Sequence, residues 1–214
     1  MKRGKRRTIG IFATLVISVL LDAGASAQSA SDWSRCAGHE GPVIDNIIEG
    51  CTAVIQASKD PPQKLATAFD NRGVAYRRKG EYDRALQDYD QAIRLNPGSA
   101  YPYNNRGIIY RIKGDYDRAI SDYDEAIWLK SGDFPAAFYN RALAYTDKRE
   151  YGHALRDFEV VMGFNAKNAL ALYARGMTLL KKGDADAGKA DIAAAKEINP
   201  NVGEQFDQSE IPVR

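Results

Sequence analysis

Histidine and cysteine are too scarce in this sequence to build most catalytic or metal-binding sites. The 214 residues include two histidines, His39 and His153, and two cysteines, Cys36 and Cys51. His39 alone cannot complete a four-ligand metal site, and neither a C-x-x-C spacing nor a glycine-rich loop after a strand is present. Catalysis needs a paired group in a shifted environment, and the sequence indicates none. We therefore predict a protein that is not an enzyme, with no cofactor and no metal.

A large excess of positive charge is also missing. The 30 basic and 28 acidic residues give a formal net charge of +2. Residues 1–27 hold five of the basic residues and one acidic residue, which leaves 25 basic and 27 acidic residues, a net charge of −2, in residues 28–214. Because binding to nucleic acid needs a basic surface, we expect no nucleic-acid partner.

The chain begins with a basic segment followed by a short apolar run. Five of the first seven residues are basic, Ile9–Leu21 is apolar, and Ala25-Ser26-Ala27 has the small residues of a cleavage site. Thirteen residues of helix span about 20 Å, which is too short for a bilayer core of about 30 Å and disfavours the alternative of an uncleaved anchor. We predict a signal peptide cleaved after Ala27. The mature protein is then expected in a bacterial periplasm or secreted, without a stable membrane anchor.

Both cysteines lie in the segment that follows, residues 28–65. Gln28–Glu40 is polar and rich in small residues, and we expect it to be poorly ordered. Val43–Ala57 has apolar residues at the spacing of an amphipathic helix. In an oxidising compartment an isolated pair is most simply a disulfide between Cys36 and Cys51, and a redox-active or metal-binding pair is the alternative. We interpret this segment as an N-terminal cap.

One stretch of sequence occurs twice at a spacing of 34 residues. Phe69–Pro97 reads FDNRGVAYRRKGEYDRALQDYDQAIRLNP, and Tyr103–Lys130 reads YNNRGIIYRIKGDYDRAISDYDEAIWLK. Each copy contains two helical patterns, and no strand pattern is visible. A repeat of this length with paired helices predicts an all-α array of stacked helical hairpins.

The repeated stretch resembles the tetratricopeptide repeat (TPR), a 34-residue pair of antiparallel helices. The resemblance extends over four units, 66–99, 100–133, 135–168 and 169–202, followed by a tail, 203–214, and it implies a right-handed superhelical solenoid. Asn46–Gln56 resembles the second half of a unit, with Cys51 where Tyr89 stands. The signature positions are matched by Phe69, Gly73, Tyr76, Ala85, Tyr89, Ala92 and Pro97; Tyr103, Gly107, Tyr110, Ala119, Tyr123 and Ala126; Phe138, Ala142, Tyr145, Ala154, Phe158 and Val161; Leu172, Gly176, Leu179, Gly188, Ile192, Ala195 and Pro200.

Other positions recur with the same period. Gly80, Gly114 and Gly183 follow the first helix of three hairpins, where we predict left-handed C-caps. An arginine and an aspartate also recur in every unit, and we interpret them as ion pairs across each hairpin, the alternative being a ladder of arginines that binds an acidic ligand. The arginines are Arg72, Arg106, Arg141 and Arg175, and the aspartates are Asp88, Asp122, Asp157 and Asp191.

The resemblance also implies a binding site, because the first helices of TPR units line a concave groove. Tyrosine and arginine are common among residues that dominate binding interfaces. The alternative is that neighbouring repeats or the C-terminal tail bury part of this surface. The candidate ligand-binding residues are Arg77, Tyr101, Asn104, Ile108, Arg111, Tyr139, Leu143, Tyr173 and Met177.

A protein partner is the first expectation. We predict a scaffold that holds a peptide or helix in the groove, with an acidic flank on the ligand for Arg77 and Arg111. One TPR subclass grips C-terminal carboxylates with a set of Lys, Asn and Arg side chains; Asn105 matches its central position, but Asp70, Val74, Ala136 and Asn140 occupy the others. The alternatives are a structural module that self-associates in the cell envelope and, less favoured, a binder of glycans or small molecules.

Overall fold

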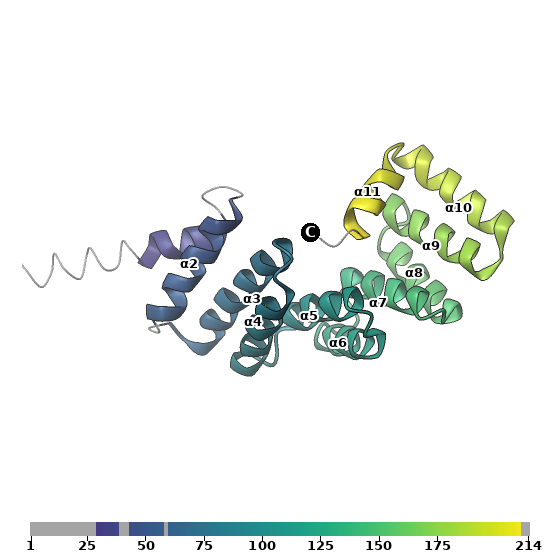
Figure 1. Ribbon diagram of the computed structural model, residues 1–214. Helices are drawn as coiled ribbons and strands as arrows, with labels where there is room; N and C mark the ends of the chain where they lie inside the picture. Colours follow the sequence, from purple (N-terminus) through teal and green to yellow (C-terminus); the bar gives the residue numbers. More distant parts are fainter. Residues whose placement is uncertain (1–28, 39–42, 58–59, 211–214) are drawn as a thin grey trace, which may run out of the picture.

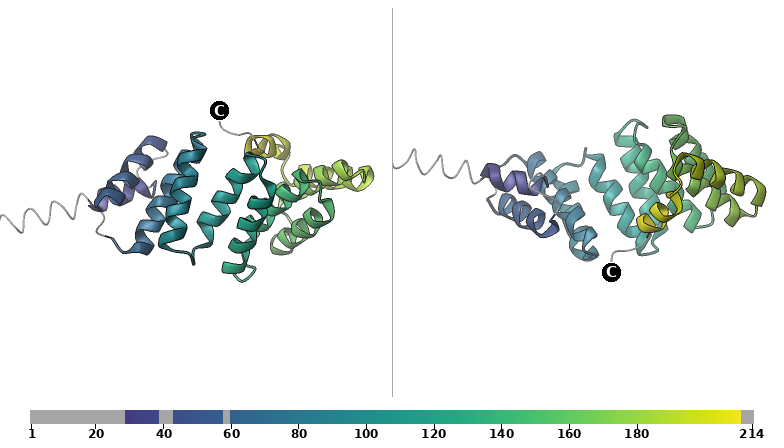
Figure 2. Two further views of the ribbon diagram at one scale, coloured as in Figure 1. Left: turned by 60° about the horizontal axis from the view of Figure 1, so that its bottom comes forward. Right: turned by 90° about the horizontal axis from the view of Figure 1, so that it is seen from above.

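The computed structural model describes residues 29–38, 43–57 and 60–210. The predicted signal peptide, His39 and the last four residues of the tail lie outside the described residues. No strand occurs in the described part of the chain. The architecture is a stacked array of helical hairpins, as the repeat pattern predicts, and the helices follow one another along an arc (Figures 1 and 2).

From α3 (Pro62–Arg78) onward, each hairpin consists of a first helix followed by a second helix, and α2 (Ile44–Ala57) precedes them in the place of a second helix. A helical segment at residues 29–36 precedes them, and the tail ends in a helix. The other helices are α4 (Tyr82–Leu95), α5 (Ala100–Ile112), α6 (Tyr116–Leu129), α7 (Pro135–Asp147), α8 (Tyr151–Phe164), α9 (Ala169–Lys182), α10 (Ala185–Ile198) and α11 (Val202–Glu210).

Each second helix buries one narrow stripe against the first helix of its hairpin. In α4 the stripe is Ala85, Asp88, Tyr89 and Ala92, whose spacing of three and four residues places them on one helical face. The Tyr89 ring packs directly against α3 at Gly73, where an added Cβ would lie 2.6 Å from Cε1 of the ring. The small residue therefore sets how closely the two helices approach, and α6 repeats the arrangement.

The recurring arginines and aspartates pair across the hairpins, as predicted. Nε and Nη2 of Arg106 donate to the two carboxylate oxygens of Asp122 at 2.9 and 2.7 Å. Such two-pronged pairing is stronger and more directional than a single contact. The same two-pronged pairing joins Arg72 with Asp88, Arg141 with Asp157, and Arg175 with Asp191.

A second set of carboxylates joins one repeat to the next, a connection that was not predicted from the sequence. Nη1 of Arg106 donates to Asp90 of the preceding unit at 2.7 Å, and Nη1 of Arg141 donates to Asp124 in the same way. In the repeated DYD triplet, the first aspartate therefore binds within its own hairpin and the second binds the next hairpin.

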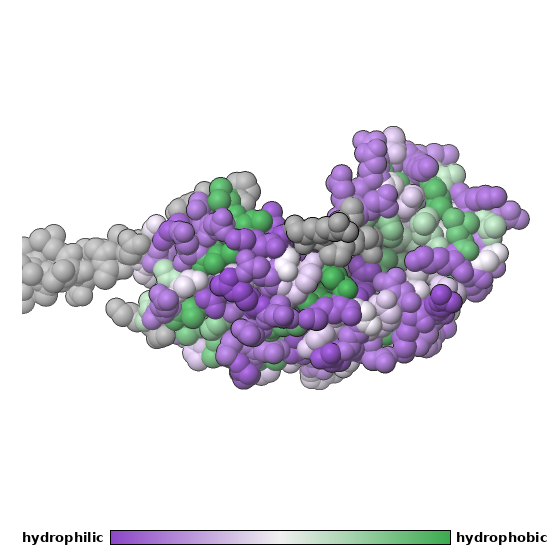
Figure 3. All heavy atoms as spheres, in the orientation of Figure 1, coloured by the Kyte–Doolittle hydropathy of each residue, from purple (hydrophilic) through white to green (hydrophobic). Residues whose placement is uncertain are grey.

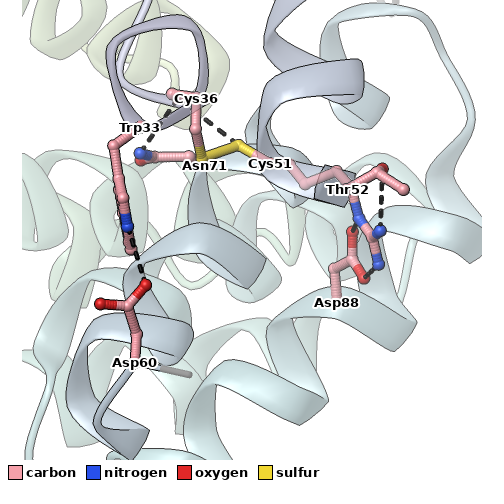
Figure 4. The surroundings of a disulfide bond; sticks show 8 residues. Trp33, Cys36, Cys51, Thr52, Asp60, Asn71 and Asp88 are labelled. Atoms are coloured by element: carbon pink, nitrogen blue, oxygen red, sulfur yellow. Dashed lines mark hydrogen bonds and ion pairs between the residues drawn. A yellow bond between two sulfur atoms is a disulfide. The ribbon is translucent and has the colours of Figure 1, made fainter. Parts of the chain in front are cut away.

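The N-terminal segment differs from its prediction. Residues 29–36 are helical rather than poorly ordered, and they pack against α2 at Gly50, where an added Cβ would lie 2.6 Å from Cβ of Arg35. Cys36 and Cys51 form a disulfide with an S–S distance of 2.07 Å, and both are buried (Figure 4). The disulfide occupies the place that a buried aromatic ring fills in later units, and Asn71 of α3 donates to the carbonyl oxygen of Cys36.

The predicted left-handed glycines are confirmed, and one hairpin departs from the rule. Gly80, Gly114 and Gly183 have φ of 76°, 78° and 104°. In the third unit the corresponding residue after α7 is Arg149, with φ of 66°. A side chain in this conformation places its Cβ against the following carbonyl oxygen, at a cost of about 1–2 kcal/mol.

Replacing Arg149 with glycine should stabilise the protein. We expect Arg149→Gly to raise the unfolding free energy by about 1 kcal/mol, since glycine adopts this conformation without the Cβ contact. Urea denaturation followed by circular dichroism measures the change. Arg149→Ala is the matched control, because it removes the same exposed side chain but keeps the Cβ. Equal effects of the two substitutions would contradict the assignment of strain.

Candidate functional site

The candidate groove residues lie on the first helices of the hairpins, which form the inner side of the arc. Arg77 is on α3, and Tyr101 and Ile108 are on α5, while Tyr139 is on α7 and Tyr173 on α9. The remaining candidates are Asn104 and Arg111 on α5, Leu143 on α7 and Met177 on α9. Figure 3 shows a hollow in the surface between the N-terminal helices and α11.

The tail helix α11 covers the C-terminal part of this inner side. Its Phe206 ring lies 5.4 Å from the Tyr173 ring, measured between centroids, and packs against the buried cluster that includes Leu143. Cα of Gly203 lies beside the Tyr173 hydroxyl, since a Cβ there would be 3.2 Å from it. Leu143 is consequently only 5% exposed. The alternative in which the tail buries part of the groove therefore holds for α9 and the adjacent face of α7.

Polar candidates in the middle of the groove bind one another across neighbouring first helices. Asn140 of α7 donates to the Asn104 side chain at 2.9 Å, and Nη1 of Arg111 donates to Asp147 at 2.9 Å. Asn104 is 7% exposed, and the Arg111 side chain is 11% exposed. These two residues tie α5 to α7. Arg111 already holds a carboxylate of this chain, so Arg77 is the better candidate to bind an acidic flank on a ligand.

The open part of the groove is lined by α3, α5 and the start of α7. Tyr101, the most exposed candidate, is 53% exposed, and its ring meets the Phe134 ring edge to face at 5.5 Å between centroids. Ile108 is half-buried, and Ala136 near the start of α7 is exposed. This region offers an aromatic ring, an aliphatic side chain and a small exposed residue to a ligand.

Asp70 lies on the same face of α3 and was not among the candidate ligand-binding residues. Burial raises the pKa of its carboxyl from 3.8 to about 6, although a hydrogen bond of 2.9 Å from Nδ2 of Asn105 opposes the shift. The same bond engages Asn105, the residue that resembles the centre of a carboxylate clamp. The sequence signal for Asp70 was only its place in the groove, because its burial depends on how α5 packs against α3.

Replacing Asp70 with asparagine should stabilise the protein above pH 6. The folded-state pKa lies above the ordinary value, so the native carboxyl costs free energy once it is ionised. With about 1.4 kcal/mol per pKa unit, we expect Asp70→Asn to gain up to about 3 kcal/mol at pH 7.5. The gain should shrink as the pH falls from 6 to 4 and vanish below the ordinary pKa of 3.8.

Urea denaturation over this pH range tests the expectation. The exposed Asp133→Asn serves as the control for the loss of a carboxylate charge outside the groove. An Asp70→Asn variant that is less stable than the wild type at pH 7.5, or a difference independent of pH, would contradict the assigned shift.

Among the described residues no group of three or more histidine, cysteine, aspartate or glutamate side chains is arranged to hold a metal ion. Across residues 29–38, 43–57 and 60–210, none of the helices has the length and apolarity needed to cross a membrane.

The fold has relatives among solved structures. A crystal structure of MamA aligns with a TM-score of 0.63 at 20% identity and covers 75% of this chain and 91% of MamA. YrrB, described as a TPR protein with an unusual peptide-binding site, gives a TM-score of 0.60 at 17% identity and covers 78% of this chain and 84% of YrrB. The first TPR domain of Spaghetti (RPAP3), bound to the HSP90 peptide SRMEEVD, gives 0.54 at 21% identity and covers 56% and 95%. At these identities the likeness concerns the fold.

Family models match three segments of the sequence. Residues 73–110 match a TPR repeat model, and residues 100–133 and 169–202 match tetratricopeptide repeat models. Two of the four recurring arginines, Arg106 and Arg175, lie within these segments together with their partners Asp122 and Asp191. The chain is therefore a tetratricopeptide repeat protein.

Proposed function

We propose that this protein is an exported, non-catalytic scaffold that binds a segment of a partner protein in the open, N-terminal part of its groove. The observation that carries the proposal is α11. A short amphipathic helix already lies on the inner side of the arc and is anchored there by Phe206 against Tyr173. A surface that holds one helix through an aromatic anchor has the chemistry to hold another beside it.

The open part of the groove has groups suited to such a segment. Tyr101 offers an exposed ring that an apolar side chain of the ligand can contact. Arg77 and Arg78 are basic residues in the last turn of α3. The Asp70 carboxylate is poorly hydrated because it is buried. When ionised, such a carboxylate is strongly stabilised by a hydrogen-bond donor on a ligand. The ligand we favour therefore combines an apolar anchor with a hydrogen-bond donor or basic group. The similar TPR structures support a peptide ligand, since YrrB has a peptide-binding site and the first TPR of Spaghetti (RPAP3) is bound to an HSP90 peptide.

Substitutions in the open groove should strongly reduce recovery of the partner. Tyr101→Ala combined with Ala136→Glu removes the exposed ring and adds charge at an exposed position, and we expect partner recovery to fall by about tenfold or more. The measurement is affinity capture from cells after crosslinking, with quantification by mass spectrometry. Trp128→Ala with Ala193→Glu, two exposed residues on second helices, is the control. Equal recovery with both double variants would contradict the groove assignment.

Export is proposed from the signal-like N-terminus. We expect the mature protein isolated from the periplasm or the medium to begin at Gln28, because the Ala25-Ser26-Ala27 triplet has the residues of a cleavage site. N-terminal sequencing of the mature protein tests this expectation. A mature chain that begins at Met1 would contradict it.

A further inference from the structure

The boundary between α2 and the first full hairpin contains a hollow of about 540 Å³. Its volume falls within the range of small-ligand sites. Thr52 of α2 and Arg72 of α3 line it together with Tyr76, Arg84 and Asp88. None of the candidate groove residues lines this hollow, so it is a separate feature from the groove. We call it the Arg72 pocket.

The Arg72 pocket lies at a boundary that lacks the bridging carboxylate found at the next two boundaries. At the next boundary Nη1 of Arg106 donates to Asp90 at 2.7 Å, and at the following one Nη1 of Arg141 donates to Asp124. At the first boundary Nη1 of Arg72 instead donates to the Thr52 hydroxyl at 3.0 Å. Arg72 therefore binds both Asp88 and Thr52, which lie near each other at this boundary (Figure 4). Since Arg106 and Arg141 hold two carboxylates each, an arginine already paired within its hairpin can still accept a second one.

The remainder of this boundary matches the next one. Arg84 lies over the Tyr76 ring at 3.9 Å from its centroid, as Arg118 lies over Tyr110 in the next hairpin. Arg84 is bound to Glu81, as Arg118 is bound to Asp115. The arginines and their own partners are therefore preserved, and the group that has been replaced is the bridging carboxylate.

The arginines that line the pocket are already paired, as Arg106 is at the next boundary, where it holds Asp90 in addition. Asp88 neutralises Arg72 within the hairpin, and Glu49 at the rim is 70% exposed and lies 3.8 Å from Arg35. The Thr52 oxygen accepts a hydrogen bond from Arg72, and its own hydroxyl hydrogen meets no acceptor among the residues that the structure describes. Two donors, the Thr52 hydroxyl and the Arg72 guanidinium, thus adjoin each other at the pocket wall.

We propose that the Arg72 pocket binds the carboxylate of a ligand, which takes the position that Asp90 and Asp124 hold at the later boundaries. The ligand class is a small carboxylic acid or an acidic side chain, because both present the same group. The carboxylate accepts hydrogen bonds from Thr52 and Arg72. This site is independent of the groove and of the proposed function.

Titration of isotope-labelled protein with sodium succinate, followed by NMR, tests the proposal. We expect saturable shifts of the Thr52 amide and of the Arg72 Nε–H signal, with a dissociation constant in the millimolar range, and no such shifts with sodium chloride at equal ionic strength. Thr52→Asp supplies the missing carboxylate from the chain and should weaken succinate binding at least about tenfold. Absence of saturable shifts in the wild type, or unchanged binding by Thr52→Asp, would overturn the proposal.

A variant can lose binding simply because it is misfolded, so a second variant is designed to gain a binding site. Asp90→Thr recreates the same vacancy at the second boundary, where Arg106 keeps Asp122, and should add a second succinate site reported by the Arg106 Nε–H signal. Asp90 is 46% exposed, so the substitution should leave the fold intact. If the Arg106 signal of this variant does not respond to succinate, a missing bridging carboxylate does not create a site, and the proposal fails.

The source of the carboxylate is distinguished with two further probes. N-acetyl-aspartyl amide carries the acidic side chain of a protein in a small soluble form, and N-acetyl-asparaginyl amide differs from it only in the missing charge. Binding of the aspartyl probe at least as tight as that of succinate supports a side chain of a partner as the source, and weaker binding supports a small acid. Equal shifts with the asparaginyl probe would show that the pocket does not recognise a carboxylate, which would overturn the proposal.

Discussion

The array depends most on the arginine that each first helix contributes near its centre. Arg106 uses its whole head group: Nε and Nη2 hold Asp122 of the same hairpin, and Nη1 holds Asp90 of the preceding one. A guanidinium is planar and its donors point in fixed directions, so both carboxylates are held only when the neighbouring helices lie at matching distances. One side chain therefore sets the spacing within a hairpin and the spacing between hairpins.

The glycine beside this arginine makes the ion pair possible. Gly107 follows Arg106, and Tyr123 follows Asp122, so the close helix contact and the ion pair lie side by side. The contact excludes water, and the Asp122 side chain is 8% exposed. Removing one partner of such a pair leaves a poorly hydrated charge, which is strongly destabilising. The four residues consequently act as one unit, which explains why the RG and DY pairs recur together in the first two hairpins.

The sequence was sufficient to predict what happens within a hairpin. The pairing of Arg72 with Asp88 and the left-handed Gly80 follow from residues that recur at fixed spacing in one chain segment. Contacts between units were harder to predict, because they depend on the rotation from one hairpin to the next. Asp90 repeats with the same period, yet its partner is revealed only when α5 is placed beside α4. The burial of Asp70 was missed for the same reason.

Features outside the repeat had no period to guide their prediction. Residues 29–36 look polar and irregular, but Gly50 of α2 lets them pack closely as a helix, with the disulfide at Cys36 fixing their end. Burial of part of the groove by the tail was one alternative, yet nothing in the tail sequence indicated that Phe206 would be the residue that lies on Tyr173.

The two ends of the array break its internal pairing in opposite ways. At the C-terminal end Ala193 stands where the bridging carboxylate would be, and α11 closes the inner side next to it. At the N-terminal end Thr52 stands at that position, and no further helix of the described residues fills the space beside Arg72. The recurring arginines and aspartates of the central hairpins already bind one another. Groups that remain available to ligands must therefore come from positions where the repeat pattern is interrupted or where the residue varies from one repeat to the next. Helix α3 carries both kinds, with Asp70 in the groove and Arg72 at the first boundary. We therefore expect ligands to bind at the first hairpin, whereas at the C-terminal end the inner side of the array is covered by the tail helix α11.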